Sequence, residues 1–302
     1  MALTTVAIMP TAAQASSTQW GEPTPPPPPV TSGAIDPPPG TSVTEVSYGP
    51  HRRQKMDIWW PTDGGQKRPG VFLIHGGWWS SGDKKYMTEI TRSYTELGYT
   101  VFNLNYRLSG DAAWPAQRVD ALDAIATARR HAARWAFDPD NYVIVGFSAG
   151  GHVAASVGTY GNGVPGLKGV VGVSPVVSPL RAYQDGADTL DPLKVRLRDA
   201  AIRLAGGCEP KGRCSRVWAS MEVSWHASRG DAPMFSVHSE DEFVPPRQSM
   251  ALKSALNKAG VNMTVRSVPG TVHSSPLYRT FGVADEVQRW ISRRVSDTRS
   301  DR

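Results

Sequence analysis

Long hydrophobic runs are missing from this chain of 302 residues. No stretch reaches the roughly 20 apolar residues that a membrane-spanning helix needs, so we expect no membrane span. The net charge is +6, from 33 Lys and Arg against 27 Asp and Glu, and no basic helix is interleaved with aromatic residues. A nucleic-acid partner is therefore not expected. We interpret the basic C-terminal segment as a solvated surface and tail.

Cysteine is also scarce. The two cysteines, Cys208 and Cys214, flank Pro210 and Gly212, which would help the chain turn back between them. This segment offers too few ligands for a metal site. In an exported protein the pair predicts a disulfide that closes a small loop, with a modest and local effect on stability. We expect no metal and no organic cofactor.

The first residues resemble the end of a secretory signal. Residues 6–9 are apolar and residues 13–15 fit an A-x-A cleavage site, but a positively charged start is missing. Either the signal at 1–20 is truncated or the resemblance is accidental. Residues 21–42 form a Pro-rich linker that favours polyproline II. We predict a secreted or periplasmic protein tethered by this linker. A ligand for a proline-binding module is the alternative.

Strand and helix patterns alternate from residue 43 onward. Strands are expected at residues 43–48, 55–60, 70–75, 99–104, 142–145, 169–173, 233–237 and 263–268, the first two as an antiparallel pair. Helices are expected at residues 86–97, 116–135, 152–160, 247–259 and 283–294. This alternation of apolar strands with helices predicts an α/β domain, built on a mostly parallel sheet covered on both faces.

Two further boundaries follow from the pattern. The interval at about 175–232 is too long for a simple crossover and is rich in Arg, Asp, Pro and Gly. We expect an insertion there, with short helices of its own that cap the site or form one of its walls. The domain is expected to span residues 43–295, followed by a basic tail at 296–302, and no internal repeat is visible.

The stretch at residues 142–151, YVIVGFSAGG, contains the most informative motif. A buried strand is predicted before it and a packed helix after it. Residues 146–150 fit G-x-S-x-G, in which the serine occupies a strained turn that exposes its hydroxyl. The flanking glycines avoid a collision there, and the helix N-terminus favours a developing oxyanion. Ser148 is therefore the predicted nucleophile.

An activated serine needs a base and an acid that orients the base. In this kind of fold both follow the nucleophile, on loops after later strands, in the order Ser, Asp or Glu, His. Of the seven histidines, only His273 follows the last predicted strand, in a turn-rich loop. The expected acid loop offers three carboxylates that compete, Glu240, Asp241 and Glu242.

Backbone donors for an oxyanion are expected in two places. The predicted strand at residues 70–75 ends in His75-Gly76-Gly77-Trp78-Trp79, and an H-G-G stretch after such a strand supplies amide donors. The amide after the nucleophile, that of Ala149, supplies another. A lost donor typically costs about 3 kcal/mol of transition-state stabilisation.

These motifs together resemble the α/β-hydrolases of the carboxylesterase type. The H-G-G-x-W group, with kynurenine formamidase-like enzymes and feruloyl and acetyl-xylan esterase-like secreted enzymes, is the most similar branch. The resemblance rests on residues 75–79 (HGGWW), 146–151 (GFSAGG) and the Asp-x-x-Val-Pro of 241–245, and it covers about residues 43–295. Residues 106–108 (YRL) and 114–116 (WPA) are similar to a Y-R-L…F-P-A stretch of that group.

The resemblance implies an α/β-hydrolase fold with a short cap insertion, and it implies roles for single residues. The implied triad is Ser148 as nucleophile, Asp241 as acid and His273 as base. The implied oxyanion donors are the amides of Gly77, Trp78 and Ala149. The chain departs from the family at His238, where Gly is usual, and at Trp78, where a third Gly is usual. Glu242 is the alternative acid.

We expect aromatic side chains to line the substrate site. Trp78 and Trp79 suggest a wall that stacks on an aryl or sugar group, and we expect Trp79 and Phe147 to contact the substrate. Trp218 and Trp225 form the opposite wall or belong to the core.

The predicted function is a serine carboxylesterase that cleaves short-chain or aryl esters through an acyl-enzyme. An arylformamidase, a peptidase or a non-catalytic binding module on the same fold are the alternatives. The substrate, which is a small-molecule or polymer-linked ester, and the oligomeric state stay open.

Overall fold

The computed structural model describes residues 36–63 and 66–296. The signal-like segment at 1–20 lies outside the described residues, as do most of the Pro-rich linker and the tail after residue 296. The predictions made for those segments therefore stay predictions.

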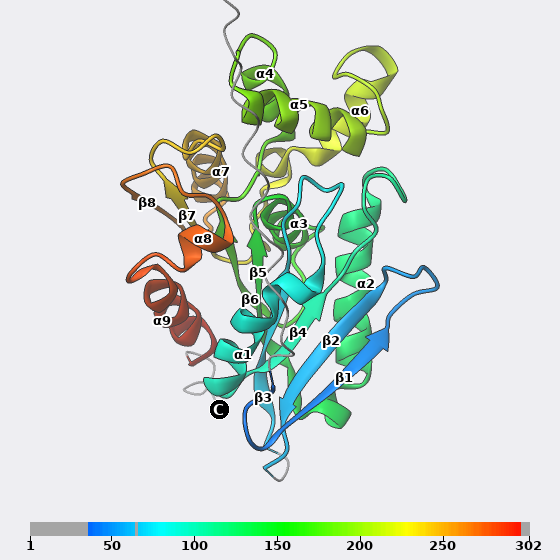
Figure 1. The fold of residues 1–302 in the computed structure, drawn as a ribbon, viewed down its shortest axis with the longest axis vertical. Helices are drawn as coiled ribbons and strands as arrows, with labels where there is room; N and C mark the ends of the chain where they lie inside the picture. Colours follow the sequence, from blue (N-terminus) through cyan, green and yellow to red (C-terminus); the bar gives the residue numbers. More distant parts are fainter. Residues whose placement is uncertain (1–35, 64–65, 297–302) are drawn as a thin grey trace, which may run out of the picture. The chain divides into compact units, whose positions relative to one another are not determined.

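One eight-stranded sheet organises the domain (Figure 1). The strand order across the sheet is β1-β2-β4-β3-β5-β6-β7-β8. Strand β2 pairs antiparallel with both β1 and β4 at one edge, and every other pair of neighbouring strands is parallel. The strands are β1 (Thr41–Ser47), β2 (Lys55–Pro61), β3 (Arg68–Ile74), β4 (Thr100–Leu104), β5 (Phe137–Phe147), β6 (Leu167–Val173), β7 (Met234–Ser239) and β8 (Met263–Val268). The predicted mostly parallel sheet, with its opening antiparallel pair, is confirmed.

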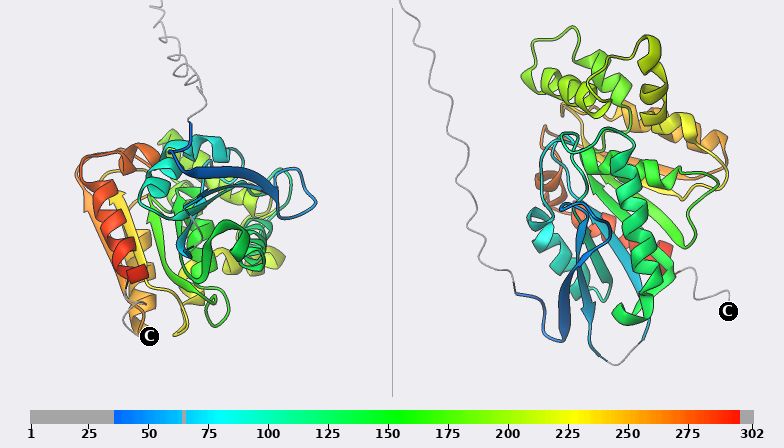
Figure 2. Two further views of the ribbon diagram at one scale, coloured as in Figure 1. Left: turned by 90° about the horizontal axis from the view of Figure 1, so that it is seen from below. Right: turned by 90° about the vertical axis from the view of Figure 1, so that its right-hand side faces the viewer.

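Helices cover both faces of this sheet (Figure 2). Buried side chains of α2 (Ala116–Arg130), α3 (Ala149–Gly158) and α7 (Arg247–Lys258) belong to the hydrophobic core on one face. Those of α1 (Thr88–Glu96), α8 (Ser275–Tyr278) and α9 (Val283–Ser296) belong to the core on the other. Within the described ranges, no helix has the length and apolar character needed to cross a bilayer.

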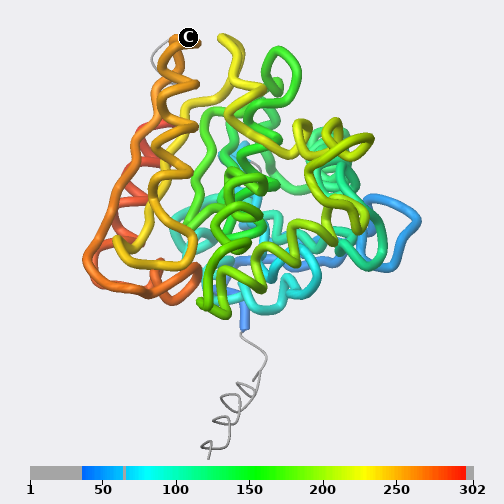
Figure 3. The backbone as a smooth tube through the Cα atoms, turned by 90° about the horizontal axis from the view of Figure 1, so that it is seen from above, coloured from blue at the N-terminus to red at the C-terminus, as the bar shows by residue number. Residues whose placement is uncertain are grey.

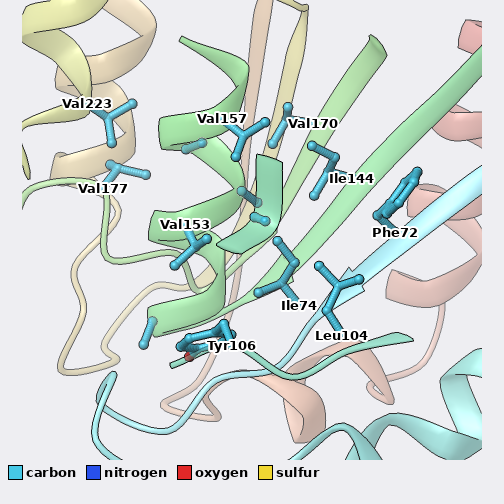
Figure 4. Packing of buried hydrophobic residues seen from close by; sticks show 14 of the residues in the cluster. Phe72, Ile74, Leu104, Tyr106, Ile144, Val153, Val157, Val170, Val177 and Val223 are labelled. Atoms are coloured by element: carbon cyan, nitrogen blue, oxygen red, sulfur yellow. The ribbon is translucent and has the colours of Figure 1, made fainter. Parts of the chain in front are cut away.

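Strand alternation assigns each side chain to one of these two cores. In β5, Ile144 faces the α2–α3 side, whereas Val143 and Val145 face the α1–α9 side. This is the two-residue period of a pleated strand that is buried on both faces. Figure 4 shows Val153 and Val157 of α3 close to Ile144 and its neighbours in the sheet.

An insertion separates β6 from β7. It contains α4 (Pro179–Asp185), α5 (Pro192–Leu204) and α6 (Ser215–Met221) and lies at the end of the domain where the parallel strands finish (Figure 1). Asp191 caps α5, since its side chain accepts hydrogen bonds from the amides of Leu193 and Lys194. Cys208 and Cys214 form a disulfide in the loop between α5 and α6.

The chain crosses the sheet from one edge to the other. Figure 3 shows the first strands (blue) at one side of the domain and the last elements (orange to red) at the opposite side. Strand β5 lies in the middle of the sheet, between β3 and β6, and carries the predicted nucleophile at its carboxyl end. Loops after β7 and β8 reach this end of the sheet as well, because those strands run parallel to β5.

Candidate active site

Ser148 occupies the turn between β5 and α3. Its backbone has φ 51° and ψ −117°, a conformation that non-glycine residues rarely adopt. A Cβ on Gly146 would lie 2.3 Å from the carbonyl oxygen of Gly150, and one on Gly150 would lie 2.3 Å from that of His75. Only glycine fits at either position, so the turn can close and lift the hydroxyl clear of the sheet.

His273 meets Ser148 from the loop after β8. Its Nε2 lies 2.8 Å from Oγ of Ser148. The amide of Ser274 donates to Oγ of Ser174 (2.9 Å), which ties this loop to the end of β6. A short helix that the sequence pattern did not predict, α8, begins directly afterwards. The pairing that chain order predicted between Ser148 and His273 is present in this geometry.

The carboxylate that reaches His273 belongs to Glu242 rather than to Asp241. Oε2 of Glu242 is hydrogen-bonded to Nδ1 of His273. The side chain of Glu242 is fully buried, whereas Asp241 is exposed. The expectation that Asp241 orients the base is therefore wrong by one position along the loop.

The physical reason lies in His238, at the end of β7. Nδ1 of His238 lies 2.9 Å from Oε1 of Glu242 and 3.2 Å from the carbonyl oxygen of Val244. The loop thus wraps around the imidazole and turns Glu242 inward. The amide of Asp241 instead donates to the carbonyl of Gly270 (3.0 Å), and its carboxylate points to solvent. A motif anchored on Val244 and Pro245 does not reveal this wrapping.

Glu242 is ionised in spite of its burial. Burial alone would raise the pKa of this carboxyl, but hydrogen bonds from His238 and His273 outweigh burial and lower it. The amide of Ser239 donates a further hydrogen bond to Oε1, at 3.2 Å. The other ring nitrogen of His238, Nε2, lies 2.8 Å from Oγ of Ser249 on α7. His238 was not among the predicted site residues.

The loop after β3 brings backbone amides to the serine. A Cβ on Gly76 would lie 3.2 Å from Cβ of Ser148, so this loop packs against the predicted nucleophile. Gly77 and Trp78 both have positive φ, at 122° and 58°. No hydrogen bond within the described ranges uses the amides of Gly77, Trp78 or Ala149 as donor. Ala149 is also the first residue of α3, where amides have no acceptor within the helix.

The buried His75 anchors that loop. Its ring stacks on Tyr106 with centroids 4.6 Å apart, and the Tyr106 hydroxyl donates to the His75 carbonyl (3.1 Å). Nδ1 of His75 lies 2.7 Å from the carbonyl oxygen of Gly76. Burial lowers the pKa of His75 to about 4, so the ring is neutral near pH 7. Tyr106, which belongs to the YRL stretch, therefore stabilises the loop at residues 75–79, which is called the oxyanion loop below.

Two residues expected to touch substrate belong to the core instead. Trp79 has no exposed surface and packs edge-on against His152, with centroids 5.5 Å apart. Phe147 is equally buried and packs against Tyr278 on the α1–α9 side. Strand alternation explains Phe147, which points to the face opposite Ile144. The buried position of Trp79 follows from the positive φ values of Trp78 and Trp79 (58° and 54°), which turn the chain so that the Trp79 indole lies inside.

An aromatic wall is nevertheless present. Trp78 is partly exposed and stacks on Phe243 (5.2 Å between centroids, 19° between planes), and Phe243 lies 4.3 Å from the ring of His273. The guanidinium of Arg196, on α5, lies 4.6 Å over the Trp78 ring. A cleft of about 420 Å³ separates Trp78 and Ser80 from α5. Phe243 was not predicted.

The two tryptophans of the insertion have different environments. Trp218 is buried and donates from Nε1 to the carbonyl of Cys208 (2.8 Å), so it belongs to the core of the insertion. Trp225 is 61% exposed. In the part of the chain that the structure describes, no group of three His, Cys, Asp or Glu side chains is arranged to hold a metal ion.

Comparisons with known proteins find similar esterases. Residues 56–170 match the model of the family described as BD-FAE. Esterase LipQ of Mycobacterium tuberculosis is 28% identical over 84% of this chain and 61% of its own length. The probable carboxylic ester hydrolase LipM of the same organism is 26% identical over 77% of this chain and 56% of its own length. The chain thus spans about three fifths of the curated relatives that it matches.

The solved structures agree on the fold. A truncated form of a carbohydrate esterase from gut microbiota superposes with a TM-score of 0.71 at 24% identity, covering 86% of this chain and 99% of that one. The chain has the α/β-hydrolase fold. In this fold, the turn that carries Ser148 and the loops that carry His273 and Glu242 lie at the carboxyl ends of β5, β8 and β7, respectively.

Proposed function

We propose that this α/β-hydrolase is a serine esterase whose reacting residues are Ser148, His273 and Glu242. The observation that carries the proposal is the continuous chain of contacts from Oγ of Ser148 through His273 to Glu242. Because Glu242 binds Nδ1–H of His273, Nε2 is the free acceptor that faces the serine hydroxyl. His273 is thus held in the tautomer that a general base requires.

The reaction begins when the Ser148 hydroxyl attacks the ester carbonyl and its proton passes to Nε2 of His273. Glu242 stabilises the imidazolium that forms. The oxyanion of the tetrahedral intermediate accepts hydrogen bonds from the free amides of the oxyanion loop and of α3, for which Gly77, Trp78 and Ala149 are the proposed donors. The imidazolium then protonates the leaving alcohol, and an acyl-enzyme remains. Water, deprotonated by His273, releases the acid and restores the serine.

We propose short-chain or aryl esters as the substrates. Trp78 and Phe243 offer flat apolar faces next to His273, and aromatic rings pack favourably against such faces. The cleft beside Trp78 has room for a small acyl or aryl group. Similar proteins include an esterase and a carbohydrate esterase, which supports ester substrates as a class.

A substrate panel tests the proposal. p-Nitrophenyl esters of increasing acyl length, an aryl formamide and peptide anilides are offered to the wild-type enzyme and to Ser148→Ala. We expect turnover of esters by the wild type alone, because the variant lacks the covalent nucleophile. A fluorophosphonate should label Ser148, as peptide mass spectrometry would show. Labelling at another residue, or equal turnover by both proteins, would contradict the assignment.

We also propose that the protein is exported. The disulfide between Cys208 and Cys214 supports an oxidising compartment. Mass spectrometry of unreduced peptides from protein recovered outside the cytoplasm should show the two cysteines linked. Protein found only in the cytoplasm, with two free thiols, would refute export.

A further inference from the structure

His238 has no part in the reaction described above, yet it is fully buried directly behind the triad. It contacts the carboxylate oxygen of Glu242 that His273 does not use. The four side chains Ser148, His273, Glu242 and His238 therefore form one continuous series of hydrogen bonds that ends at Ser249. A buried histidine placed in this way needs an explanation beyond filling space.

The neighbours of His238 define its tautomer. Nδ1 faces only acceptors, Oε1 of Glu242 and the carbonyl oxygen of Val244, so it carries the proton. Nε2 faces the hydroxyl of Ser249, which can donate to it. A neutral ring satisfies all these groups at once. His238 is therefore a directed donor to Glu242.

The carboxylate of Glu242 depends on a small set of donors. His238, His273 and the amide of Ser239 supply them, and no Lys or Arg of the described residues forms an ion pair with it. The titratable side chains in contact with it are the two histidines. The other acids of the same loop, Glu240 and Asp241, are exposed. A buried carboxylate that loses one of so few donors becomes more basic and less fixed in orientation.

We propose that His238 is a positioning residue of this esterase, which holds Glu242 ionised and in the rotamer that orients His273. The inference rests on the proposed function of Ser148, His273 and Glu242. Without the Nδ1 donor, Glu242 keeps only the hydrogen bonds from His273 and the Ser239 amide. Its carboxylate is then held less firmly, and the pair formed by Glu242 and His273 takes up a proton more readily. Both effects reduce the fraction of enzyme in which Nε2 of His273 is free to accept from the serine.

Three variants separate the effect of the Nδ1 donor of His238 from the effect of removing its imidazole ring. His238→Asn places an amide nitrogen near the position of Nδ1 and keeps the donor. His238→Gln places its amide nitrogen near Nε2 and loses that donor. Ser249→Ala removes only the partner of Nε2 on the far side. All three retain a polar or small side chain, and thermal unfolding of each shows whether the fold is kept.

The expected result is a split between these variants. His238→Gln should lower kcat roughly 10- to 100-fold with little change in KM, as expected for a lost hydrogen bond to a charged group. The acid limb of its kcat/KM profile should move to higher pH, because the pair binds a proton more readily. His238→Asn should stay within a few-fold of the wild type with an unshifted profile, and Ser249→Ala should lose only a few-fold.

Equal losses in His238→Asn and His238→Gln would overturn the proposal, as would a loss of stability in His238→Gln with kcat and the pH profile unchanged. The rate at which a fluorophosphonate labels Ser148 is a second readout that needs activation of the serine but no ester turnover. If the wild type is labelled rapidly yet hydrolyses no ester of the panel, the proposed substrate class is wrong. The role of His238 is then still tested by comparing the labelling rates of the variants.

A second observation concerns the cleft beside Trp78. Along one face of α5, at helical spacing, Arg196, Asp199 and Arg203 line the cleft. Asp199 is paired with Arg198 at 2.7 Å, whereas no ion pair of the described residues involves Arg196 or Arg203. The cleft wall thus carries two guanidinium groups without an acid partner. Guanidinium groups bind carboxylates through two parallel hydrogen bonds.

We infer that this cleft binds a carboxylate on the ester substrate, an inference that also rests on the proposed esterase function. Two matched pairs of esters test it. 4-Carboxyphenyl acetate is compared with 4-carbamoylphenyl acetate, and p-nitrophenyl hemisuccinate with p-nitrophenyl butyrate. The first pair places the charge on the leaving group and the second places it on the acyl group.

The readout is the ratio of kcat/KM for the charged and the neutral ester of each pair. Replacing Arg196 and Arg203 together by Gln should lower this ratio about tenfold for one pair. The matched control is Lys258→Gln, at the end of α7, which runs away from this end of the sheet. Ratios unchanged in the double variant, or equally changed in the control, would refute the inference. Absence of turnover of all four esters by the wild type would instead refute the proposed function.

Discussion

Glu242 binds Nδ1 of His273 from a fully buried position, while its neighbour Asp241 is exposed to solvent. The two carboxylates are adjacent in the chain and differ by a single methylene group. Their surroundings nevertheless give them different roles, since only the buried one can select the tautomer of the base. Substitutions at these two positions are therefore the most direct test of the site.

Glu242→Gln should lower kcat by about four orders of magnitude, as in the serine-protease case of an acid replaced by its amide, because the amide can hold the wrong tautomer of His273. Asp241→Asn should leave kcat within about twofold, since it removes only an exposed charge. Steady-state kinetics on one p-nitrophenyl ester compares both variants with wild type. A nearly normal Glu242→Gln enzyme beside an inactive Asp241→Asn enzyme would return the acid role to Asp241.

The sequence was sufficient for the main features that depend on local pattern, although it did not predict the short helix α8. Strand alternation, the G-x-S-x-G turn and the order of the loops predicted the sheet, Ser148 and His273. The acid depended on how a loop wraps around His238, which no spacing in the sequence records. The same holds for Trp79 and Phe147, whose side chains point inward because of backbone dihedrals and strand register. A histidine at the buried end of β7 was the one available signal that this loop departs from the expected pattern.

Gly150→Ala should prevent correct closure of the nucleophile turn. Its Cβ would lie 2.3 Å from the carbonyl oxygens of both Ile74 and His75, which belong to the strand end and the oxyanion loop and cannot move independently. We expect a loss of about 3 kcal/mol or more in the free energy of unfolding, measured by urea denaturation. Gly110→Ala is the control, because nothing lies within 4 Å of a Cβ added there. Similar stability of the two variants would show that the turn has more freedom than its contacts imply.

The adjacent residues Trp78 and Trp79 should respond differently to replacement by Ala. Trp78→Ala removes a partly exposed face of the aromatic wall and should raise KM for aryl esters several-fold more than for acetate esters of small alcohols. Trp79→Ala leaves a cavity in the core and should lower the free energy of unfolding by about 3–5 kcal/mol. Kinetics and urea denaturation of both variants provide the comparison. A stability loss in the first variant and a KM effect in the second would reverse the assignment of the wall.

Stability should fall as the solution is acidified because of two buried histidines. Burial lowers the pKa of His152 to about 4, and that of His75 to about 4 as well. In the unfolded chain both have a pKa near 6.5, so between about pH 6.5 and pH 4 the unfolded state binds more protons than the native state. The stabilisation is fully present above about pH 6.5 and is lost as the pH falls toward 4. Each histidine accounts for up to about 3 kcal/mol of that loss.

His152→Gln isolates one of these contributions. Nε2 of His152 lies 2.8 Å from the carbonyl oxygen of Met221, and the amide nitrogen of Gln can occupy a similar position without titrating. The variant should be less stable than wild type at pH 7, since the ring also packs against Trp79 and Trp114. Its free energy of unfolding should fall less steeply than that of wild type between pH 6.5 and pH 4, by up to about 3 kcal/mol in total. Urea denaturation at half-unit steps of pH measures both curves. Parallel curves would mean that His152 takes up its proton equally in the native and unfolded states, which would require water to reach the ring in the folded protein.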